Sequence, residues 1–493
     1  MRTSRKIPAE ESVFMNRKMI LCFLGMTAFL EAGLMLLPAI VALIYGETSG
    51  YAFLGAIAVC LLLGLMGILI KPEKRTMFAK DGFVAVSLCW IVLSLIGALP
   101  FTISGQIPNY IDAVFETVSG FTTTGSSILT NVEGLSHCML FWRSLTHWVG
   151  GMGILVFMLA FLPSLGGQTI HLLRAESPGP TVDKVVPRMR DSAKILYLIY
   201  LAMTVVLVLL YLLAGMPLFD SLCIAFGTAG TGGFAITGDS LAHYSPLIQS
   251  ITTVFMFLFG VNFSMYFFLL KRKWKAAFSM SEVWTYAAIV GLATLAITIN
   301  TRGYYDTTGQ ALHHAAFSVS SVITTTGYGT VDFSLWPEFS RVILCLLMIV
   351  GACAGSTGGG FKVSRLILLY KASRNELRKL IHPNSVKVAR MDGRPVPEDT
   401  LRGVWLYLAV YVAVLAGSIL LVSLDNFDAS TTVTSVLATL NNIGPGLNVV
   451  GLAGSFASLS YLSKIVLILD MLLGRLELFP VLFLFLPSTW LKK

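Results

Sequence analysis

One stretch of the sequence, residues 318–333, carries threonine and glycine at a spacing that suits coordination of a cation by the backbone. It reads SVSSVITTTGYGTVDF, with Thr325, Thr326, Gly327 and Tyr328 at its centre. Main-chain carbonyl oxygens can replace the water around a monovalent cation without the full charge that would trap the ion. Glycine adopts at little cost the backbone angles that turn successive carbonyls toward one axis. The chemistry that this stretch predicts is therefore cation coordination.

Three further stretches repeat the pattern. The best match is DAVFETVSGFTTTG at residues 112–125, and two weaker copies are DSLCIAFGTAGTGGF at 220–234 and TTVTSVLATLNNIGPG at 431–446. Residues 325–329 also differ at one position from the TVGYG sequence that lines potassium-channel filters. Such a filter needs four segments around one axis, so four copies in one chain could supply all of it.

We expect each copy to contribute a central glycine and its neighbours to one cation-binding filter. The predicted lining residues are Thr123, Thr124, Gly125 and Ser126 in the first copy, Gly230, Thr231 and Gly232 in the second, Thr325, Thr326, Gly327 and Tyr328 in the third, and Asn442, Ile443 and Gly444 in the fourth. The threonine hydroxyls could add ligands or brace the loops. The alternative is that these small residues only let membrane helices approach closely, but four copies at matching places favour the filter.

The elements that hold these segments must lie in a membrane, because 55% of the residues are hydrophobic and only 12% are charged. That composition excludes a water-soluble chain of this length. Ten apolar runs are long enough to be predicted as membrane spans: 19–45, 51–70, 83–104, 140–164, 195–215, 247–270, 283–299, 341–370, 403–423 and 460–487. The first run has no small-residue cleavage pattern after it, so we expect a retained helix and no signal peptide.

The charge distribution sets the expected orientation. Of the 35 Lys and Arg residues, 30 lie in alternate connections, at 1–18, 71–80, 174–194, 271–275, 362–402 and the C-terminus. Basic loops stay in the cytoplasm, so both termini are expected there. This topology accounts for the net charge of +9 and leaves no reason to expect nucleic acid as a partner. The seven cysteines have no CxxC spacing and are expected as buried residues, not as metal ligands or disulfides.

Each copy lies between two predicted spans. A unit reads as an apolar helix going out, a short segment going back in, the Gly/Thr stretch, and a second apolar helix. Irregular backbone at membrane depth is tolerated only where protein buries it or where it lines a water-filled cavity. The sequence thus predicts an all-α polytopic membrane protein with four tandem helix–pore helix–helix repeats around a pseudo-fourfold pore, preceded by two extra spans. The acidic residues Asp112, Glu116, Asp220 and Asp428 could attract cations to its mouth or cap the short helices.

The predicted units are residues 1–80 for the two-span N-terminal part, and 81–185, 186–277, 278–395 and 396–493 for the four pore repeats. The third repeat contains GACAGSTGGG at 351–360, and a segment this rich in glycine predicts a break in the helix. The sequence disfavours a phosphate-binding loop here, because Phe361 separates Gly360 from Lys362 and no Ser or Thr directly follows the lysine.

These motifs make the chain similar to members of the Trk/Ktr/HKT superfamily of potassium transporters, in particular to the TrkH-type membrane subunit. The matching stretches are SGFTTTGSS at 119–127, WRSLTHWVGGMGI at 142–154, TGGF at 231–234, TTTGYGTVDF at 324–333, GACAGSTGGGFKVSR at 351–365, NNIGPG at 441–446 and MLLGRLELF at 471–479. The resemblance covers essentially the whole chain. It implies potassium uptake across the bacterial inner membrane, with the potassium ion in the filter and no covalently bound cofactor. The second and fourth copies lack the threonine run, so we expect an uneven lining.

The resemblance also implies a gate and partners. An intramembrane loop under the filter would obstruct the pore, with an arginine of the tenth span beside it. The expected gate residues are Gly351, Ala354, Gly355, Ser356, Thr357, Gly358, Gly359, Gly360, Lys362 and Arg475. Arg475 could instead pair with Asp470 or Glu477. The implied partners are a second copy of the chain in a homodimer and a cytoplasmic ring of subunits on basic loops such as 371–402, and the nucleotide, ATP/ADP or NAD(H), would bind only to that ring.

Two other function classes are alternatives. A sodium- or proton-coupled symporter also binds its ion at broken helices near the midplane, often in inverted repeats, whereas these units all start on the same side. An intramembrane enzyme would need a catalytic constellation, and the sequence has no HExxH, no GxGD-type aspartate pair and no GxSxG in a plausible setting. His147 and Glu116 have no partner that their spacing would fix. Potassium transport is the function that the sequence favours.

Overall fold

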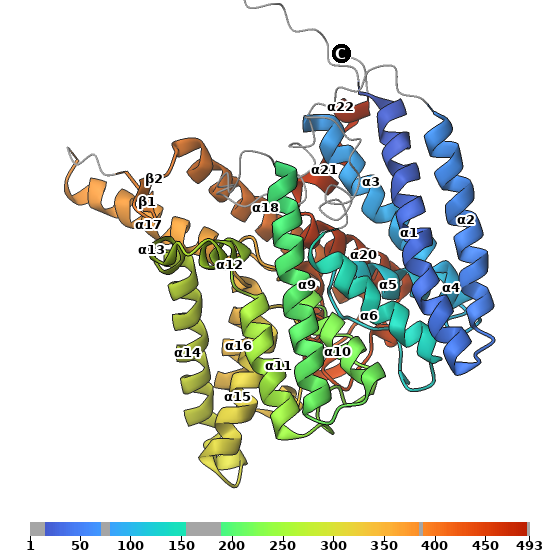
Figure 1. Ribbon diagram of the computed structural model, residues 1–493. Helices are drawn as coiled ribbons and strands as arrows, with labels where there is room; N and C mark the ends of the chain where they lie inside the picture. Colours follow the sequence, from blue (N-terminus) through green and yellow to red (C-terminus); the bar gives the residue numbers. More distant parts are fainter. Residues whose placement is uncertain (1–14, 71–78, 154–188, 384–387, 491–493) are drawn as a thin grey trace, which may run out of the picture.

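The computed structural model describes residues 15–70, 79–153, 189–383 and 388–490, and within these ranges the chain is almost entirely helical (Figure 1). The exception is an antiparallel hairpin of β1 (Arg390–Met391) and β2 (Arg394–Pro395). The predicted all-α fold is confirmed. The N-terminal segment 1–14, most of the connection at 71–80, the end of the fourth predicted span with the basic connection after it, and the last three residues lie outside the described ranges.

Two long apolar helices, α1 (Arg17–Tyr45) and α2 (Gly50–Leu69), stand as a pair at one edge of the molecule (Figure 1). Their backbones approach closely, since a Cβ on Gly25 would lie 2.8 Å from the Gly67 Cα, and small residues permit such contacts between membrane helices. Helix α1 also packs against α3 and α6. The two helices that precede the first repeat are therefore present, and α1 packs against helices of that repeat.

A long helix followed by a short one occurs four times in the described chain. The pairs are α3 (Ala79–Gly97) with α5 (Tyr110–Phe121), α9 (Met189–Leu213) with α10 (Leu218–Gly230), α14 (Ser281–Thr301) with α15 (Thr308–Ile323), and α18 (Glu398–Val422) with α19 (Ala429–Leu440). The connections contain α4 (Leu99–Ile103), η1 (Arg302–Tyr304) and η3 (Ser423–Asp425). The short helices have 12 to 16 residues, too few to cross a bilayer.

The helices that follow the short ones in the second, third and fourth units are interrupted; the sequence predicts this break for the third unit but a continuous span for the second and fourth. Helix α11 (Pro246–Phe259) bends by 88° into α12 (Phe263–Leu270). Helix α16 (Glu338–Val350) is separated from α17 (Val363–Ile381) by residues 351–362, as the glycine content predicted, and α20 (Tyr461–Arg475) stops before α21 (Phe479–Phe485). Helix α6 (His137–Gly151) ends near the limit of the described residues.

Six of the described helices are long and apolar enough to span a membrane, or seven if the bent pair α11–α12 counts as one span. The remaining described elements are α13 (Trp274–Phe278), η2 (Phe333–Leu335), η4 (Asn448–Val450), η5 (Phe456–Ser458) and α22 (Pro487–Trp490). The predicted spans 247–270, 341–370 and 460–487 are each divided by a break into shorter helices, which hydropathy averaged over about 20 residues does not separate from one span, and the predicted span 140–164 ends outside the described residues. The number of ten spans therefore stays a prediction.

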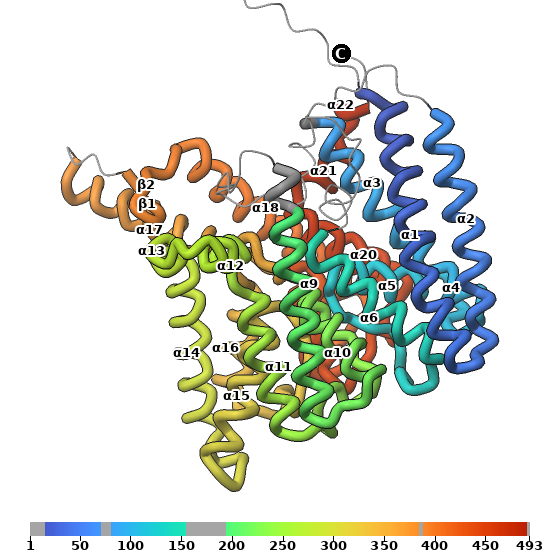
Figure 2. The backbone as a smooth tube through the Cα atoms, in the orientation of Figure 1, coloured from blue at the N-terminus to red at the C-terminus, as the bar shows by residue number. Residues whose placement is uncertain are grey.

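Successive units lie beside one another around the molecule, as Figure 2 shows from α9–α11 in green through α14–α16 in yellow to α17 and α18 in orange. The short helices end in the interior of the protein. Every residue of α5 from Ala113 to Phe121 is buried, and so are residues 317–323 of α15 and 434–440 of α19. The segments that follow these helices therefore start deep inside the protein, where only protein or an internal cavity can contact them.

Candidate functional site

The four segments that follow the short helices share one backbone conformation. Each begins with a residue of positive φ that is not glycine, an uncommon state: Thr123 (53°), Thr231 (53°), Thr325 (59°) and Asn442 (55°). Each has a glycine of positive φ two positions later: Gly125 (86°), Gly233 (80°), Gly327 (84°) and Gly444 (104°). The amide between them bonds back to a carbonyl of the short helix at 2.8 Å in every copy, from Thr124, Gly232, Thr326 and Ile443. The four copies are therefore equivalent in structure as well as in sequence.

This equivalence corrects the register of the second copy by one residue. The central glycine there is Gly233, whereas Gly232 occupies the place of Thr124 and Thr326. Gly232 is glycine for another reason, because a Cβ on it would overlap the His147 ring. The sequence TGGF offers two adjacent glycines, and aligning its Thr231 with Thr123 would have selected the second of them.

The four segments meet in a closed ring. A Cβ built on each central glycine would run into a carbonyl oxygen of the next segment, and that oxygen belongs to the equivalent residue each time. The pairs are Gly125 with Gly232 O, Gly233 with Thr326 O, Gly327 with Ile443 O, and Gly444 with Thr124 O at 2.8 Å. The order of contacts is first to second, second to third, third to fourth and fourth to first. A side chain at any of the four glycines would collide with backbone oxygen, so this ring requires glycine.

One side of the ring opens into a cavity with about 660 Å³ of empty space, part of it continuous with solvent. All four central glycines line it, together with Ser126, Ser127, Arg143, Pro445 and the loops at 234–240 and 450–456. The predicted residue Gly230 does not line this cavity. It ends α10, and a Cβ on it would overlap the His147 carbonyl oxygen. The four central glycines therefore share one cavity on this side of the ring.

Several predicted lining residues connect the segments by side-chain hydrogen bonds, and of these only Ser126 also lines the cavity. The Thr122 and Thr124 hydroxyls lie 2.8 Å apart. The side-chain amide of Asn442 donates to Thr124 Oγ1 at 2.9 Å and so connects the fourth segment to the first. Ser126 Oγ donates to Gly444 O at 2.9 Å. The fully buried Tyr328 donates from its hydroxyl to Phe234 O at 3.2 Å, which ties the third segment to the second.

The other side of the ring is covered by residues 351–362, called the α16–α17 loop below. The Gly359 amide donates to Thr325 Oγ1 at 2.7 Å. A Cβ on Gly358 would lie 2.8 Å from Thr324 O, and one on Gly359 would lie 2.6 Å from Asn441 O. The Lys362 ammonium donates to the Gly358 carbonyl and closes the loop on itself. The α16–α17 loop thus presses against the third and fourth segments where they begin.

The predicted gate residues do not all face the ring. The backbones of Gly351 and Gly360 contact each other closely near the two ends of the α16–α17 loop, and both residues have positive φ. Ala354 and Gly355 lie on the opposite side, where the Gly355 carbonyl accepts from the Phe263 amide at 3.0 Å. Ser356 bonds within the loop, donating to the Cys353 carbonyl at 2.7 Å. The residues of the loop that contact the segments of the ring are therefore Gly358 and Gly359, whereas Thr357 contacts Arg475.

Arg475 ends α20 and lies where the ring, the α16–α17 loop and α6 meet. Its guanidinium donates to Thr123 Oγ1 at 3.3 Å, to Thr357 O at 3.0 Å and to Gly151 O at 2.8 Å, and also to the Gly150 carbonyl. It therefore adds a positive charge on the same side of the ring as the loop.

The two carboxylates proposed as alternative partners of Arg475 have other contacts. Glu477 forms an ion pair with Arg365, and Asp470 accepts from the Ser418 hydroxyl at 2.8 Å. Arg365 also stacks over the Tyr407 ring at 4.0 Å from its centroid. These contacts join α17 and α18 to the break between α20 and α21, next to Arg475.

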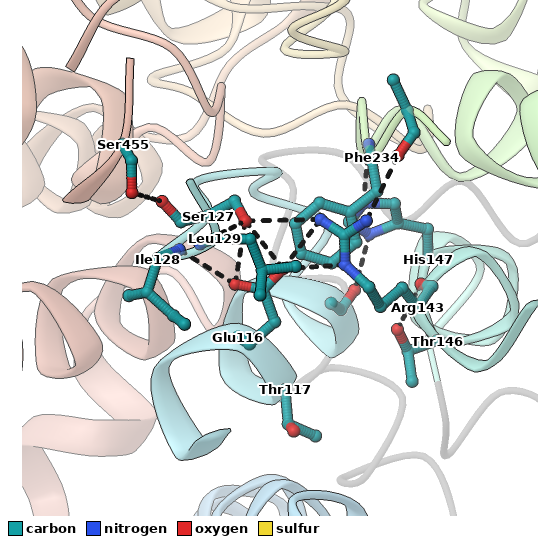
Figure 3. Close-up of polar contacts among 12 residues, drawn as sticks. Glu116, Thr117, Ser127, Ile128, Leu129, Arg143, Thr146, His147, Phe234 and Ser455 are labelled. Carbon is teal, nitrogen blue, oxygen red and sulfur yellow. Dashed lines mark hydrogen bonds and ion pairs between the residues drawn. The ribbon is translucent and has the colours of Figure 1, made fainter. Parts of the chain in front are cut away.

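A buried ion pair whose two partners could not be matched from the sequence lies beside the ring and supports it (Figure 3). Glu116 of α5 and Arg143 of α6 lie 2.7 Å apart with side-chain exposures of 0% and 3%. The Glu116 carboxylate also accepts from Ser127 Oγ at 2.9 Å and from the Ile128 amide at 3.0 Å. Arg143 donates to Ala235 O at 3.2 Å. The pair thus joins the loop after the first segment to the loop after the second.

His147 makes a second contact between the same two segments. Its Nε2 accepts from the Phe234 amide at 3.1 Å, so Nδ1 carries the proton and donates to Gly120 O at 2.8 Å. The Arg143 guanidinium lies over the Phe234 ring at 4.0 Å from its centroid. Phe234 is therefore held from both sides, directly after Gly233.

The acidic residues predicted near the pore mouth are engaged in contacts. They comprise Glu116 in the buried pair, Asp112 at 2.7 Å from the Lys464 ammonium, Asp220 at 2.9 Å from the Tyr244 hydroxyl, and Asp428 at 3.0 Å from the Thr431 amide. Only the last is a helix cap, at the start of α19. The capping interpretation thus holds for one residue, and ion pairing or hydrogen bonding accounts for the other three.

Comparison with known proteins places the whole chain among transporters. The sequence model of the family described as "TrkH: Cation transport protein" matches residues 49–288 and 303–492. The Trk system potassium uptake protein TrkH of Salmonella typhimurium is 40% identical, with 97% of this chain and 100% of that protein covered. TrkG of Escherichia coli K12 is 32% identical over 94% of this chain and 97% of its own length. The crystal structure of the potassium transporter TrkH from Vibrio parahaemolyticus superimposes with a TM-score of 0.86 at 33% identity, covering 97% and 100% of the two chains.

Proposed function

The chain belongs to the TrkH family of cation transport proteins, and we propose that it takes up potassium through the ring formed by its four Gly/Thr segments. It is a multi-pass membrane protein of a transporter family, not of an enzyme family. The relatives that are named potassium uptake proteins match it over nearly their full length. The observation that carries the proposal is the cyclic contact of each central glycine with the carbonyl of the next segment.

In this proposal the ion loses its water to main-chain oxygens. The equivalent oxygens of the four segments are the carbonyl oxygens of Thr124, Gly232, Thr326 and Ile443. Each of them lies so close to the central glycine of a neighbouring segment that no side chain fits at that glycine. Neutral carbonyls can replace the hydration shell of a monovalent cation and still release it. The short helices end just before these segments, so the negative ends of their dipoles favour a cation there. The metal in this site is the transported potassium ion.

The proposed gate consists of the α16–α17 loop and Arg475. Gly358 and Gly359 lie against the ring, and Arg475 donates both to Thr357 O of the loop and to Thr123 Oγ1 of the ring, so its positive charge lies between the two. A cation leaving the ring on this side would meet both a steric obstacle and a like charge. We therefore propose that transport requires the loop and Arg475 to move away from the segments.

Regulation is proposed to come from the end of the molecule that carries the basic loops. Helix α12, which the basic residues 271–273 follow in sequence, and α17, which carries Arg374 and Lys379, lie next to the β1–β2 hairpin at that end (Figure 1). Basic loops favour the cytoplasmic side, so this end would face the cytoplasm of a bacterium and both termini would lie there. A ring of nucleotide-binding subunits would dock on it, with ATP/ADP or NAD(H) bound to the ring alone. The membrane subunit would act as a homodimer.

The test is growth of a bacterium that lacks its own potassium uptake systems on limiting potassium. The wild-type chain should restore growth, and Gly125 or Gly327 replaced by Ser or Asp should not, because either side chain would enter the space of a carbonyl of the next segment. Gly303→Ser is the matched control, since a Cβ there has no atom within 4 Å. Equal growth of all variants would overturn the assignment of the ring as the potassium filter.

A further inference from the structure

We propose that Glu282 and Asp392 are positioning residues that connect the exposed β1–β2 hairpin to the α16–α17 loop. The inference rests on the proposed function, because it concerns what holds that loop against the ring. Neither residue belongs to the ring or to the expected gate. The connection runs from Asp392 in the hairpin turn, through the first turn of α14, to the loop.

Glu282 binds both the α16–α17 loop and the start of α17. It is the second residue of α14 and is 3% exposed. Its Oε1 accepts from the Ala354 amide at 2.7 Å and from the Ser364 amide at 3.0 Å. Hydrogen bonds to an ionised carboxylate are roughly twice as strong as neutral ones, and they also offset the cost of burying the group. One side chain of α14 therefore connects Ala354 within the loop to Ser364 in the first turn of α17.

The rest of the α16–α17 loop is held at the break between α11 and α12 and against the ring. The Cys353 amide donates to Gly260 O at 3.1 Å, and the Phe263 amide donates to Gly355 O at 3.0 Å. On its far edge the loop reaches Thr325 through the Gly359 amide. A shift of the loop relative to α14 would therefore change its contact with the ring directly.

Asp392 holds the start of α14. Asp392 and Gly393 both have positive φ, at 51° and 80°, as a two-residue hairpin turn of the Asp-Gly kind requires. The Asp392 carboxylate accepts from the Ser281 amide at 2.8 Å and from the Ser281 hydroxyl at 2.7 Å. The residue that precedes α14, Met280, provides no side-chain cap. A carboxylate from the hairpin thus takes the place of an N-cap and complements the positive end of α14.

The hairpin can transmit a displacement because it is both exposed and anchored. Its turn residues are exposed, whereas Met391 packs with Leu368 of α17 and Val404 of α18 in a small buried cluster. Lys371 of α17 also donates to Arg390 O at 2.8 Å. A partner that moved the hairpin would withdraw Asp392 from Ser281, loosen the turn that carries Glu282, and release the α16–α17 loop.

The test measures potassium flux into liposomes that contain the full-length chain without any partner. Glu282→Ala and Asp392→Ala should each raise the flux about fivefold or more, the lower range of typical coupling between sites. Glu282→Gln keeps an acceptor oxygen at the same reach and should stay within about twofold of wild type, since a neutral hydrogen bond retains about half the strength. Asp399→Ala, an exposed carboxylate of α18 close to the hairpin, should leave the flux unchanged. The potassium-to-sodium permeability ratio should stay at its wild-type value throughout, because the ring is untouched.

A general loss of structure would lower the flux or the permeability ratio, whereas a released loop raises flux alone. Asp392 is exposed, so its variant should fold and keeps the test decisive if Glu282→Ala folds poorly. Unchanged flux in Asp392→Ala and Glu282→Ala, with raised flux in Arg475→Ala, would overturn the connection and leave the proposed gate standing. Absence of potassium flux in every protein, Arg475→Ala included, would contradict the proposed function and the connection with it.

Discussion

Replacing Glu116 by Gln should weaken both the stability of the protein and its potassium uptake. The change removes the negative partner of Arg143, which is 3% exposed and lines the cavity above the ring. Arg143 would remain buried with its charge, because its contact with Ala235 O and its place over the Phe234 ring do not neutralise it. The unpaired positive charge of Arg143 would then repel any cation in the cavity.

The magnitudes follow from burial and distance. Removing one partner of a buried pair costs about 3–5 kcal/mol, and at an unfolding entropy of about 2.1 cal/mol/K per residue this lowers the Tm of the chain by about 3–5 °C. At an effective dielectric constant of about 20, a unit positive charge costs a cation about 1.7 kcal/mol at a separation of about 10 Å. Potassium uptake should therefore fall by a factor of about 15–20, since 1.36 kcal/mol corresponds to about tenfold.

The assay combines thermal unfolding of the purified protein with potassium uptake into liposomes. Glu376→Gln is the control for a lost ion pair, because Glu376 and Lys379 are 69% and 50% exposed and such pairs contribute about 0–1 kcal/mol. The double change of Glu116→Leu with Arg143→Met should recover stability, since apolar replacements of a whole buried pair are commonly tolerated. Wild-type Tm and uptake in Glu116→Gln would refute the reasoning.

Two further changes test the gate and the bracing of the ring. Arg475→Ala should raise the potassium flux measured without a partner about tenfold, within the usual range of coupling energies. The control Arg402→Ala, at the exposed start of α18, should leave the flux unchanged. Unchanged flux in both variants would count against the gate. Asn442→Gly keeps the positive φ but removes the amide that donates to Thr124 Oγ1, so the potassium-to-sodium permeability ratio should drop about fivefold for a loss of ~1 kcal/mol. Asn426→Gly, exposed and of positive φ, is its control, and a ratio equal to wild type in both would show that the amide does not shape the ring.

The membrane character, the two added helices and the fourfold recurrence of the Gly/Thr segments could be predicted from the sequence, because each depends on local composition. The register of the second segment could not be set by glycine alone, since Gly232 and Gly233 are adjacent and only the backbone conformation distinguishes them. The breaks at 260–262 and 476–478 carry no glycine-rich signal like that of 351–360, so they were missed.

The supporting contacts depend on pairs that are distant in sequence. Glu116 and Arg143 are 27 residues apart, and Glu282 reaches amides 72 and 82 residues away. The residue types alone do not predict these partners, because the same carboxylates could equally cap helices or attract cations. Arg475 was expected near the α16–α17 loop. Its hydrogen bond to Thr123 of the opposite segment could be identified only from the three-dimensional structure.

The central claim is that four equivalent glycines close one potassium filter, and Gly233 tests it most directly because the sequence pattern pointed to its neighbour. The measurement is the potassium-to-sodium permeability ratio, from reversal potentials of the reconstituted protein, for Gly233→Ala and for Gly238→Ala. A Cβ on Gly233 would collide with Thr326 O, whereas one on Gly238 has no atom within 4 Å although both glycines line the same cavity. The account predicts a collapsed ratio for Gly233→Ala and a wild-type ratio for Gly238→Ala. A wild-type ratio in Gly233→Ala would contradict it.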